Sequence, residues 1–590
     1  MHSKRRLLVL IVGLLVVVLL VQAKSHPQAD PCQNFYGVAC GNWSAIHASD
    51  AYQSFLGQLD YNYQAKLADL LDAEYFAKGG HDEPHSVQQL RYFYTACRRP
   101  LTQDQVLRSL EQLIALEHIQ FEEMTVGLTA AFRLQVLASI NHYNKYDIFK
   151  QLLARREHWH PNTTNREPLT RQQFDELWVR MPKIPFPEKE DFWHQVSRLE
   201  AELTSIGIEN DETARDELVS WIPSFWMLPW PKLTYRNLHR VTRLLALRTP
   251  QFMLTYIYLR LQLPPEGGVS KDTWLMDRDQ CAEQSRQILS HAAVWLMEQH
   301  HPRLKEEPLL QDIFEELKQR FGQKLRANRN NFTRRTQQFL VRKLKRMRLR
   351  LSILPRNASA TTVGQLIDGH YRHVHMNASD YFGNLYIGLN HSSPQMHEYG
   401  TFASPFYITE KNMLIVPLSL LEPPLYAHDQ PPILTYSSLG FILGHELSHG
   451  FDSEGVTFSA DGVASRAVDR ETARNPRFQH ELSCLDRRFG SRRYEKFADA
   501  SGLELAYSAY FDTAQTDRKR HRSTDNLLSQ QQQFFHNFAQ FFCSDGEFSE
   551  ESDHGSDRKR VNDAVAHFKP FREAFSCGTS HKRRRQCRLF

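Results

Sequence analysis

Residues 435–455 read TYSSLGFILGHELSHGFDSEG and contain the pattern His445-Glu446-x-x-His449 near their centre. The apolar residues on either side of this pattern recur at helical spacing, which predicts an amphipathic helix. Residues four positions apart share one face of a helix, so both imidazoles can reach the same metal ion. Glu446 directly follows the first histidine, where its carboxylate can hold and deprotonate a water molecule on that ion.

Two interpretations of this helix compete. A His-Glu-x-x-His pattern also arises by chance on core helices of long chains. Here the helix begins after Ser437-Ser438 and ends at Gly450, so the local structure agrees with the motif. We therefore interpret the segment as a catalytic zinc site, with one Zn2+ per chain, two histidine ligands, an open coordination position and a carboxylate general base.

A third ligand is expected on a second helix further along the chain. Glu495 and Asp499 lie one turn apart on a segment with helical periodicity. Glu495 would complete a His2Glu set, and Asp499 would accept the second ring N–H of a ligand histidine. Asp452 is a candidate partner for the other ligand histidine. Alone, such a pair of carboxylates is usually a solvated helix face, so the interpretation depends on His445 and His449.

Further motifs surround these two helices in a fixed order along the chain. They are Asp30-Pro31-Cys32-x-x-Phe35-Tyr36-x-x-Ala39-Cys40-Gly41-x-Trp43, Glu422-Pro423-Pro424, Glu495-x-x-Ala498-Asp499, Phe534-Phe535-x-Asn537-Phe538-Ala539-Gln540, and Arg560-Val561-Asn562 through Ala574-Phe575-x-Cys577. With the histidine motif they resemble the neprilysin and endothelin-converting-enzyme family of zinc metallopeptidases. The resemblance is close from about residue 400 to the end and faint between about 50 and 370.

The resemblance implies a mainly α fold with a small sheet, in two lobes of zincin type. A chain of 590 residues also exceeds one compact core. We expect an N-terminal segment 24–45 stapled to the catalytic lobe, a helical capping lobe over 46–368 and a zinc catalytic lobe over 369–590. Helical periodicity is clear from Phe55 to Leu71. The apolar stretch from Phe406 to Pro417 predicts a strand before the zinc helix.

The resemblance also implies catalytic and substrate-binding roles. Glu446 would be the general base, Asp499 would orient a ligand histidine, and His554 would donate a hydrogen bond to the tetrahedral oxyanion. Arg560 would either position the substrate or brace the site. Family members act on small peptides and favour a hydrophobic residue just after the cleaved bond.

Two departures from the family pattern bear on substrate handling. Ser404-Pro405 stands where the family has an Asn-Ala pair that hydrogen-bonds the substrate backbone. Serine offers one hydroxyl in place of an amide, and proline has no N–H. Tyr494 and Lys496 flank the third-ligand glutamate in place of Gly and Asn. Lys496 could compete with zinc for that carboxylate or point to solvent.

The N-terminus predicts an extracytoplasmic protein. Residues 1–23 have a basic start, an apolar run from Leu7 to Val21 and a small-residue cleavage site, which predicts a secretory signal peptide. The alternative is a retained type II membrane anchor at the plasma membrane. Six N-glycosylation sequons fit this compartment. They begin at Asn42, Asn162, Asn331, Asn357, Asn377 and Asn390.

The eight cysteines are an even number, and disulfides are the default in an oxidising compartment. Spacing alone leaves their connectivity open. The resemblance implies four pairs that use every cysteine. These pairs are Cys32–Cys577, Cys40–Cys543, Cys97–Cys281 and Cys484–Cys587.

The charge of the chain gives little information about its binding partners. The net charge of +5 does not by itself suggest a nucleic-acid partner. Basic runs at 334–350, 518–522 and 582–585 are most simply solvated surfaces, with anionic glycans or acidic surfaces as the sharper alternative. The favoured function is a secreted zinc metalloendopeptidase of short peptides. Rival hypotheses are an inactive or weakly active peptide-binding pseudo-peptidase and, less favoured, a structural zinc site in an adhesion module.

Overall fold

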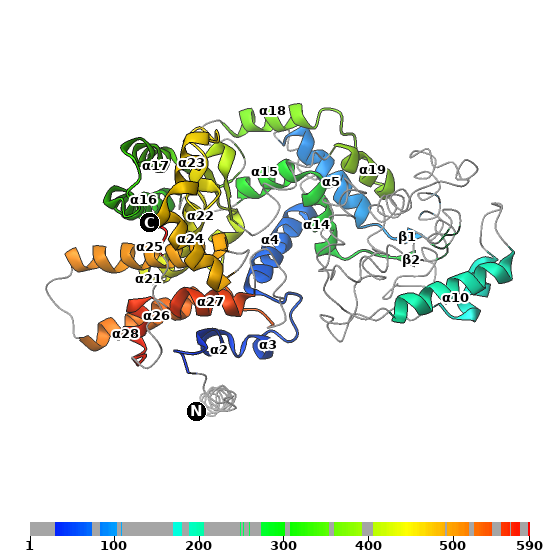
Figure 1. Cartoon of the computed structure of the whole chain (residues 1–590). Coiled ribbons are helices and arrows are strands. Elements are labelled where there is room, and N and C mark those ends of the chain that lie inside the picture. The colour runs from blue at the N-terminus through cyan, green and yellow to red at the C-terminus, as the bar shows by residue number, and fades with distance from the viewer. Residues whose placement is uncertain are drawn as a thin grey trace, which may run out of the picture. The chain divides into compact units, whose positions relative to one another are not determined.

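The described part of the chain is mainly helical. The computed structural model describes residues 30–73, 83–102, 169–179, 188–205, 273–300, 307–352, 359–391, 405–489, 493–517, 524–545, 556–566, 568–578 and 588–590, with the single residues 105, 108, 248, 252, 256, 259 and 354. Helices dominate these residues and the strands are short, as predicted (Figure 1). None of the helices in these ranges combines the length and apolar character that a membrane span requires. The predicted signal segment 1–23 lies outside them.

The chain divides into two compact units, each discontinuous in sequence. The first comprises residues within 1–63, 301–352 and 402–590, and the second residues within 64–300 and 353–401. This division differs from the boundary expected at residue 368, because residues 307–352 group with the C-terminal part. Strand β3 (Arg348–Arg350) explains the difference, since it pairs in parallel with β5 (Met413–Ile415).

The second unit is built from helices and one two-stranded sheet. Its elements are α5 (His85–Cys97), α9 (Arg171–Trp178), α10 (Lys189–Ser205), α14 (Arg278–Ile288), α15 (Ser290–His300), α18 (Ala360–His370), α19 (Tyr381–His391), β1 (Leu101–Thr102) and β2 (Thr273–Trp274). A disulfide joins Cys97 to Cys281 between α5 and α14. Helix α4 (Phe55–Asp72), which the sequence predicted, has residues in both units.

The first unit holds the predicted site residues. Its helices are α2 (Phe35–Cys40), α3 (Trp43–Ile46), α16 (Glu307–Ala327), α17 (Arg334–Arg346), α21 (Pro432–Thr435), the π-helical turn η6 (Tyr436–Gly440), α22 (Phe441–His449), α23 (Arg466–Arg474), α24 (Pro476–Phe489), α25 (Arg493–Asp517), α26 (Thr524–Gln540), α27 (Asp557–Ala566) and α28 (Lys569–Ala574). Short 3-10 turns are η4 (Thr409–Lys411), η5 (Leu418–Leu421) and η7 (Gly455–Thr457).

A three-stranded sheet precedes the zinc helix. Its order is β3-β5-β4, with β4 (Phe406–Ile408) antiparallel to β5 and at the edge. The single strand predicted from Phe406 to Pro417 is therefore wrong. The chain turns back through η4, where Asn412 takes a left-handed conformation with φ of 46°. Asparagine tolerates this conformation better than most residues, which allows the tight reversal.

Helices α22 and α25 pack with their backbones in close approach. A Cβ added to Gly444 would lie 3.0 Å from the Cα of Gly502, and one added to Gly502 would lie 2.7 Å from the backbone nitrogen of His445. Gly502 therefore has no room for a Cβ unless the backbone shifts, and a Cβ at Gly444 would press on the backbone of Gly502. The contact brings the helix that carries the histidine motif against the helix that carries Glu495.

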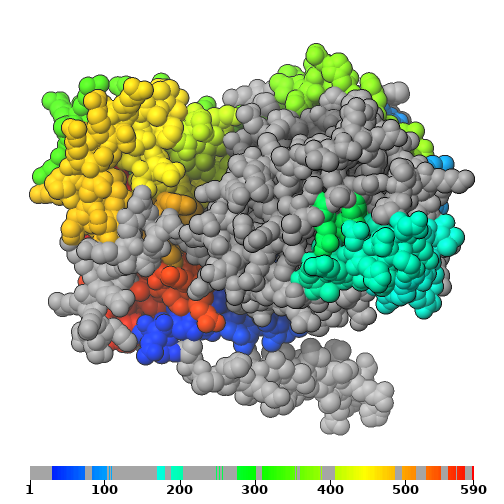
Figure 2. All heavy atoms as spheres, turned by 45° about the vertical axis from the view of Figure 1, so that its right-hand side comes forward, coloured from blue at the N-terminus to red at the C-terminus, as the bar shows by residue number. Residues whose placement is uncertain are grey.

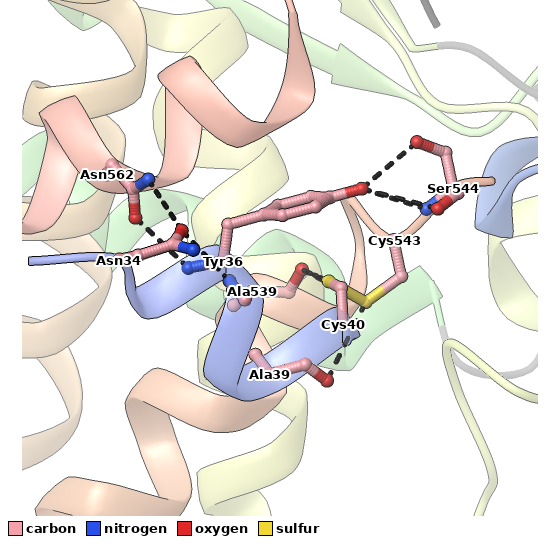
Figure 3. Close-up of a disulfide and its surroundings, with 9 residues drawn as sticks. Asn34, Tyr36, Ala39, Cys40, Ala539, Cys543, Ser544 and Asn562 are labelled. Carbon is pink, nitrogen blue, oxygen red and sulfur yellow. Dashed lines mark hydrogen bonds between the residues drawn. A yellow bond between two sulfur atoms is a disulfide. The ribbon is translucent and has the colours of Figure 1, made fainter. Parts of the chain in front are cut away.

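The N-terminal segment is stapled to helices near the C-terminus (Figures 2 and 3). Disulfides Cys32–Cys577 and Cys40–Cys543 close loops across almost the whole chain. Cys484 is also disulfide-bonded, and its expected partner Cys587 lies outside the described residues.

Side chains reinforce this staple. The Tyr36 hydroxyl lies 3.1 Å from Ser544 Oγ. Asn562 accepts the Tyr36 backbone N–H at 3.0 Å and donates to Asn34 Oδ1 at 3.1 Å (Figure 3). The staple thereby fixes α27, the helix that carries Arg560.

We predict that Asn562→Ala loosens the staple and lowers the melting temperature. The Tyr36 N–H in the first turn of α2 loses its acceptor, which costs about 1–3 kcal/mol when the donor stays buried. Asn562→Asp keeps the acceptor for Tyr36 but sets a carboxylate oxygen against Asn34 Oδ1, so it should also melt below wild type. Equal melting curves for all three proteins would contradict this role.

Candidate metal centre

Two buried side chains and one half-buried side chain, from α22 and α25, converge on one point. The Nε2 atoms of His445 and His449 lie 3.0 Å apart. Glu495 Oε2 lies 3.5 Å from His445 Nε2, and its Oε1 lies 3.6 Å from His449 Nε2. One ligand atom from each residue lies within 4.8 Å of the others, which makes this group able to hold a metal ion.

Carboxylates face the far side of both imidazoles. Asp499 Oδ1 lies 3.0 Å from His445 Nδ1, and Asp452 Oδ2 lies 3.1 Å from His449 Nδ1. These contacts favour the tautomers that carry the proton on Nδ1, so both Nε2 lone pairs point at the shared space. Such an arrangement fits a cation, because two lone pairs 3.0 Å apart otherwise repel. Both carboxylates occupy the places that the sequence suggested.

The site has an excess of negative charge. Burial opposes the protonated form of His445, but contacts with Asp499 and Glu495 raise its pKa to about 10. The protein without a cation therefore holds a proton there. The donor set of two imidazoles and one carboxylate is that of a known class of catalytic zinc sites.

Arg560 braces the carboxylates from α27. Its Nε and Nη2 atoms donate to the two oxygens of Asp499 at 2.9 and 2.7 Å, and Nη2 lies 3.5 Å from Glu495 Oε2. Burial alone would raise the pKa of the Asp499 carboxyl, but the charge of Arg560 holds it well below its usual range. This geometry corresponds to the bracing alternative for Arg560.

The other predicted catalytic residues are only partly described. Glu446 is buried on α22 between the two histidines, 6% exposed. Pro405 directly precedes the edge strand β4 and is half-buried. His554 and Ser404 lie outside the described residues. Of the glycosylation sequons, Asn42, Asn331 and Asn377 are exposed. Asn162 and Asn357 lie outside the described residues, and the Asn390 side chain is likewise not described.

Lys496, next to the third-ligand glutamate, is buried rather than solvent-exposed. Its side chain is 4% exposed, and its Nζ lies 2.7 Å from Asp563 Oδ2 on α27. Asp563 is a residue that sequence reasoning missed. Its only sequence signal is its position one turn after Arg560. Together, Lys496–Asp563 and Arg560–Asp499 tie α25 to α27 at two adjacent points.

Lys343 lies beneath the loop that follows the second histidine. It is fully buried, donates to the Gly455 carbonyl, and lies 5.6 Å from the centre of the Phe451 ring. Burial lowers the pKa of Lys343 to about 7, and the nearby charge of Asp452 offsets this only in part. The same loop carries Asp452, whose Oδ1 accepts the Gly455 N–H at 2.7 Å.

Comparison with known proteins bears directly on this site. Residues 404–589 match the profile of Peptidase family M13. The match covers the part of the chain that holds the candidate metal centre. Membrane metallo-endopeptidase-like 1 of Mus musculus is 29% identical over 208 residues, which are 31% of this chain and 27% of that protein. Neprilysin of Oryctolagus cuniculus is 25% identical over 245 residues, 36% of this chain and 32% of that protein. The matched region thus spans about a third or less of these relatives.

Solved structures of low identity share the fold over nearly the whole chain. The structure of PepO from Lactobacillus rhamnosis has a TM-score of 0.58 at 13% identity and covers 95% of this chain and 99% of its own. A zinc metalloprotease of Mycobacterium tuberculosis, solved with an inhibitor, has a TM-score of 0.56 at 14% identity, with 94% and 96% covered. The likeness in fold therefore extends beyond the region that sequence comparison matches.

We predict that the Lys496–Asp563 pair supports the metal centre. Asp563→Asn removes the carboxylate that faces the buried Lys496 ammonium, which should cost on the order of 3 kcal/mol of apparent stability and weaken zinc binding. The double variant Lys496→Met/Asp563→Asn removes both charges and should recover most of the loss. Zinc affinity by chelator competition and the melting temperature would be measured on all variants. The single variant Lys496→Met would be measured as well. A loss of stability in the double variant equal to the sum of the two single losses would contradict the pairing.

We predict that Lys343 contributes more to the stability of the metal-free protein at pH 9 than at pH 7. The folded-state pKa of about 7 lies below the ordinary lysine value of 10.5, so the unfolded lysine binds more protons between these values. The contribution of Lys343 therefore rises with pH in this window, whereas His445, whose pKa is raised, contributes in the opposite direction. The change in denaturant midpoint from pH 7 to pH 9 should therefore be more positive in wild type than in Lys343→Met. Lys345→Met, on the exposed side of the same helix, is the control and should keep the wild-type slope.

Proposed function

We propose that this chain is a zinc-dependent endopeptidase that hydrolyses short extracellular peptides. The observation that carries the proposal is the convergence of the two Nε2 atoms and the Glu495 carboxylate on one point, with Glu446 buried beside them. His445, His449 and Glu495 would hold the ion. When bound, the ion supplies a Lewis acid for the scissile carbonyl and for the attacking water.

The chain's own residues account for the proton transfers and the positioning. Glu446 would accept a proton from the attacking water and pass it to the leaving amine. Asp499 and Asp452 keep the Nδ1 protons on the two histidines, so that Nε2 remains the ligand atom. Arg560 keeps Asp499 ionised inside the protein. His554 is proposed as the oxyanion donor on the strength of the family resemblance alone.

The substrate is proposed to be a small peptide. The family match supports a peptidase, and β4 is the edge strand of the described sheet. An extended peptide can add to such an edge through backbone hydrogen bonds. Ser404 and Pro405 precede β4, and Pro405 contributes no N–H at this point. Losing one substrate contact would weaken binding by about 1–3 kcal/mol.

The second candidate is a pseudo-peptidase that binds peptides without cleaving them. Ser404 and Pro405 are the observation that favours it. Glu446 opposes it, because a protein that only binds peptides has no need for a buried carboxylate beside the ligands. For either function we propose a secreted, disulfide-bonded glycoprotein, with a type II membrane anchor as the alternative. An N-terminal sequence of the mature protein that starts near Lys24 would exclude the anchor.

We predict that wild type cleaves a quenched fluorescent peptide with a hydrophobic residue after the scissile bond, and that a chelator stops it. Glu446→Gln should bind zinc as wild type does and lose about 100-fold or more in rate, because the proton acceptor is gone. Glu454→Gln, an exposed glutamate on the loop after the same helix, is the matched control and should keep full activity.

Zinc content would be measured on all three proteins. If wild type binds zinc and cleaves no member of a broad peptide library, the endopeptidase proposal is wrong and the pseudo-peptidase remains. If wild type binds no zinc, the metal site itself is wrong.

A further inference from the structure

Helices α17 and α23 lie side by side in the first unit, although about 120 residues separate them in sequence (Figure 1). At the start of α17, the Thr333 and Thr336 hydroxyls donate to Glu471 of α23 at 2.8 and 2.5 Å. At the other end, Arg346 Nη1 lies 2.9 Å from Asp461, which precedes α23. These two ties at opposite ends make the helices antiparallel neighbours.

The apolar sides of both helices face inward. Leu340 and Leu344 of α17 and Val468 of α23 are all below 5% exposed. The polar sides therefore point to solvent, and they are strongly basic. Three exposed residues from each helix form what we call the basic face. They are Arg335, Arg342 and Arg346 on α17 and Arg466, Arg470 and Arg474 on α23.

The spacing of these arginines produces two rows. On α23 they recur every four residues, so the Cα atoms of successive arginines lie about 6 Å apart along the helix axis. On α17 the intervals of seven and four residues again select one side of the helix. Two neighbouring antiparallel helices thus present two rows of arginine on one surface.

Acidic residues neutralise the basic face only in part, since Arg346 contacts Asp461. The sequence of α17 contains no acidic residue, and α23 contains only Asp469 and Glu471. Glu471 accepts hydrogen bonds from Thr333 and Thr336, which places it between the helices. Like charges four residues apart on a helix repel each other. The α23 row therefore carries a repulsion that a bound polyanion would relieve.

We infer that the basic face binds a linear sulfated polysaccharide of the heparan sulfate type. Arginine presents a planar fork of donors that suits tetrahedral oxyanions, and regularly spaced anions can contact both rows at once. The compartment proposed for this chain favours such a partner over nucleic acid. An interfacial membrane helix instead requires an exposed apolar face, and the apolar residues of α17 and α23 larger than alanine are buried or half-buried. This inference is independent of peptidase activity.

The test uses the full chain from secretory expression, so that any glycan at Asn331 beside α17 is present. Binding to a heparin oligosaccharide would be measured at several salt concentrations for wild type and for Arg466→Gln/Arg470→Gln/Arg474→Gln. We expect wild-type affinity to fall steeply with salt, and the triple variant to bind about tenfold or more weakly with a shallower dependence. Zinc content and melting temperature of the variant should match those of wild type.

A control variant that loses the same number of positive charges distinguishes a specific binding site from general electrostatic attraction. Arg99→Gln/Arg372→Gln/Lys569→Gln removes three exposed basic residues outside α17 and α23 and should bind heparin as wild type does. Equal loss in both triple variants, or no wild-type binding at physiological salt, would overturn the inference. Equal affinity for hyaluronan, duplex DNA or phosphatidylserine vesicles would also overturn it, because sulfate selectivity would be absent.

Discussion

The close contact between α22 and α25 is the constraint on which the candidate site depends. Gly444 and Gly502 let the two backbones approach to a distance that no side chain would permit. Glu495 and Asp499 lie two turns and one turn before Gly502, on the side of α25 that faces α22. Short side chains can therefore meet the histidines of α22. A larger residue at either glycine would separate the helices and with them the ligand atoms.

Buried charge is the second constraint. Asp499 and Glu495 are almost fully buried, and unpaired carboxylates in such surroundings would be costly. Arg560 supplies the compensating charge from α27, and the disulfide-linked N-terminal segment holds α27 in place through Asn562. A series of side-chain contacts thus connects the disulfide-linked segment at Cys32 and Cys40 with His445. It explains why the first described residues of the chain matter for a site more than 400 residues away.

Charges on the surface of the same unit are arranged differently from those at the metal centre. Near the metal centre the buried cations Arg560 and Lys496 each contact a carboxylate, because water cannot solvate them there. On α17 and α23 solvent screens the arginines, so the fold tolerates two rows that carry mainly positive charge. Of these two regions, only the exposed one is available to a large anionic partner.

Several features were determined by the sequence alone, because they depend on local spacing. The histidines and Glu446 share one helix, and Glu495 and Asp499 share another, so helical periodicity was sufficient to predict each group. The turn at Asn412 was missed because β4 and β5 are both apolar and too short to separate by pattern. Tertiary structure alone decided the contacts between distant segments: Lys496 with Asp563, Arg560 with Asp499, Lys343 under the loop of Asp452, and α17 beside α23. It also decided that residues 307–352 group with the C-terminal part of the chain. The physical reason is that these contacts arise from packing between elements, which no local period encodes.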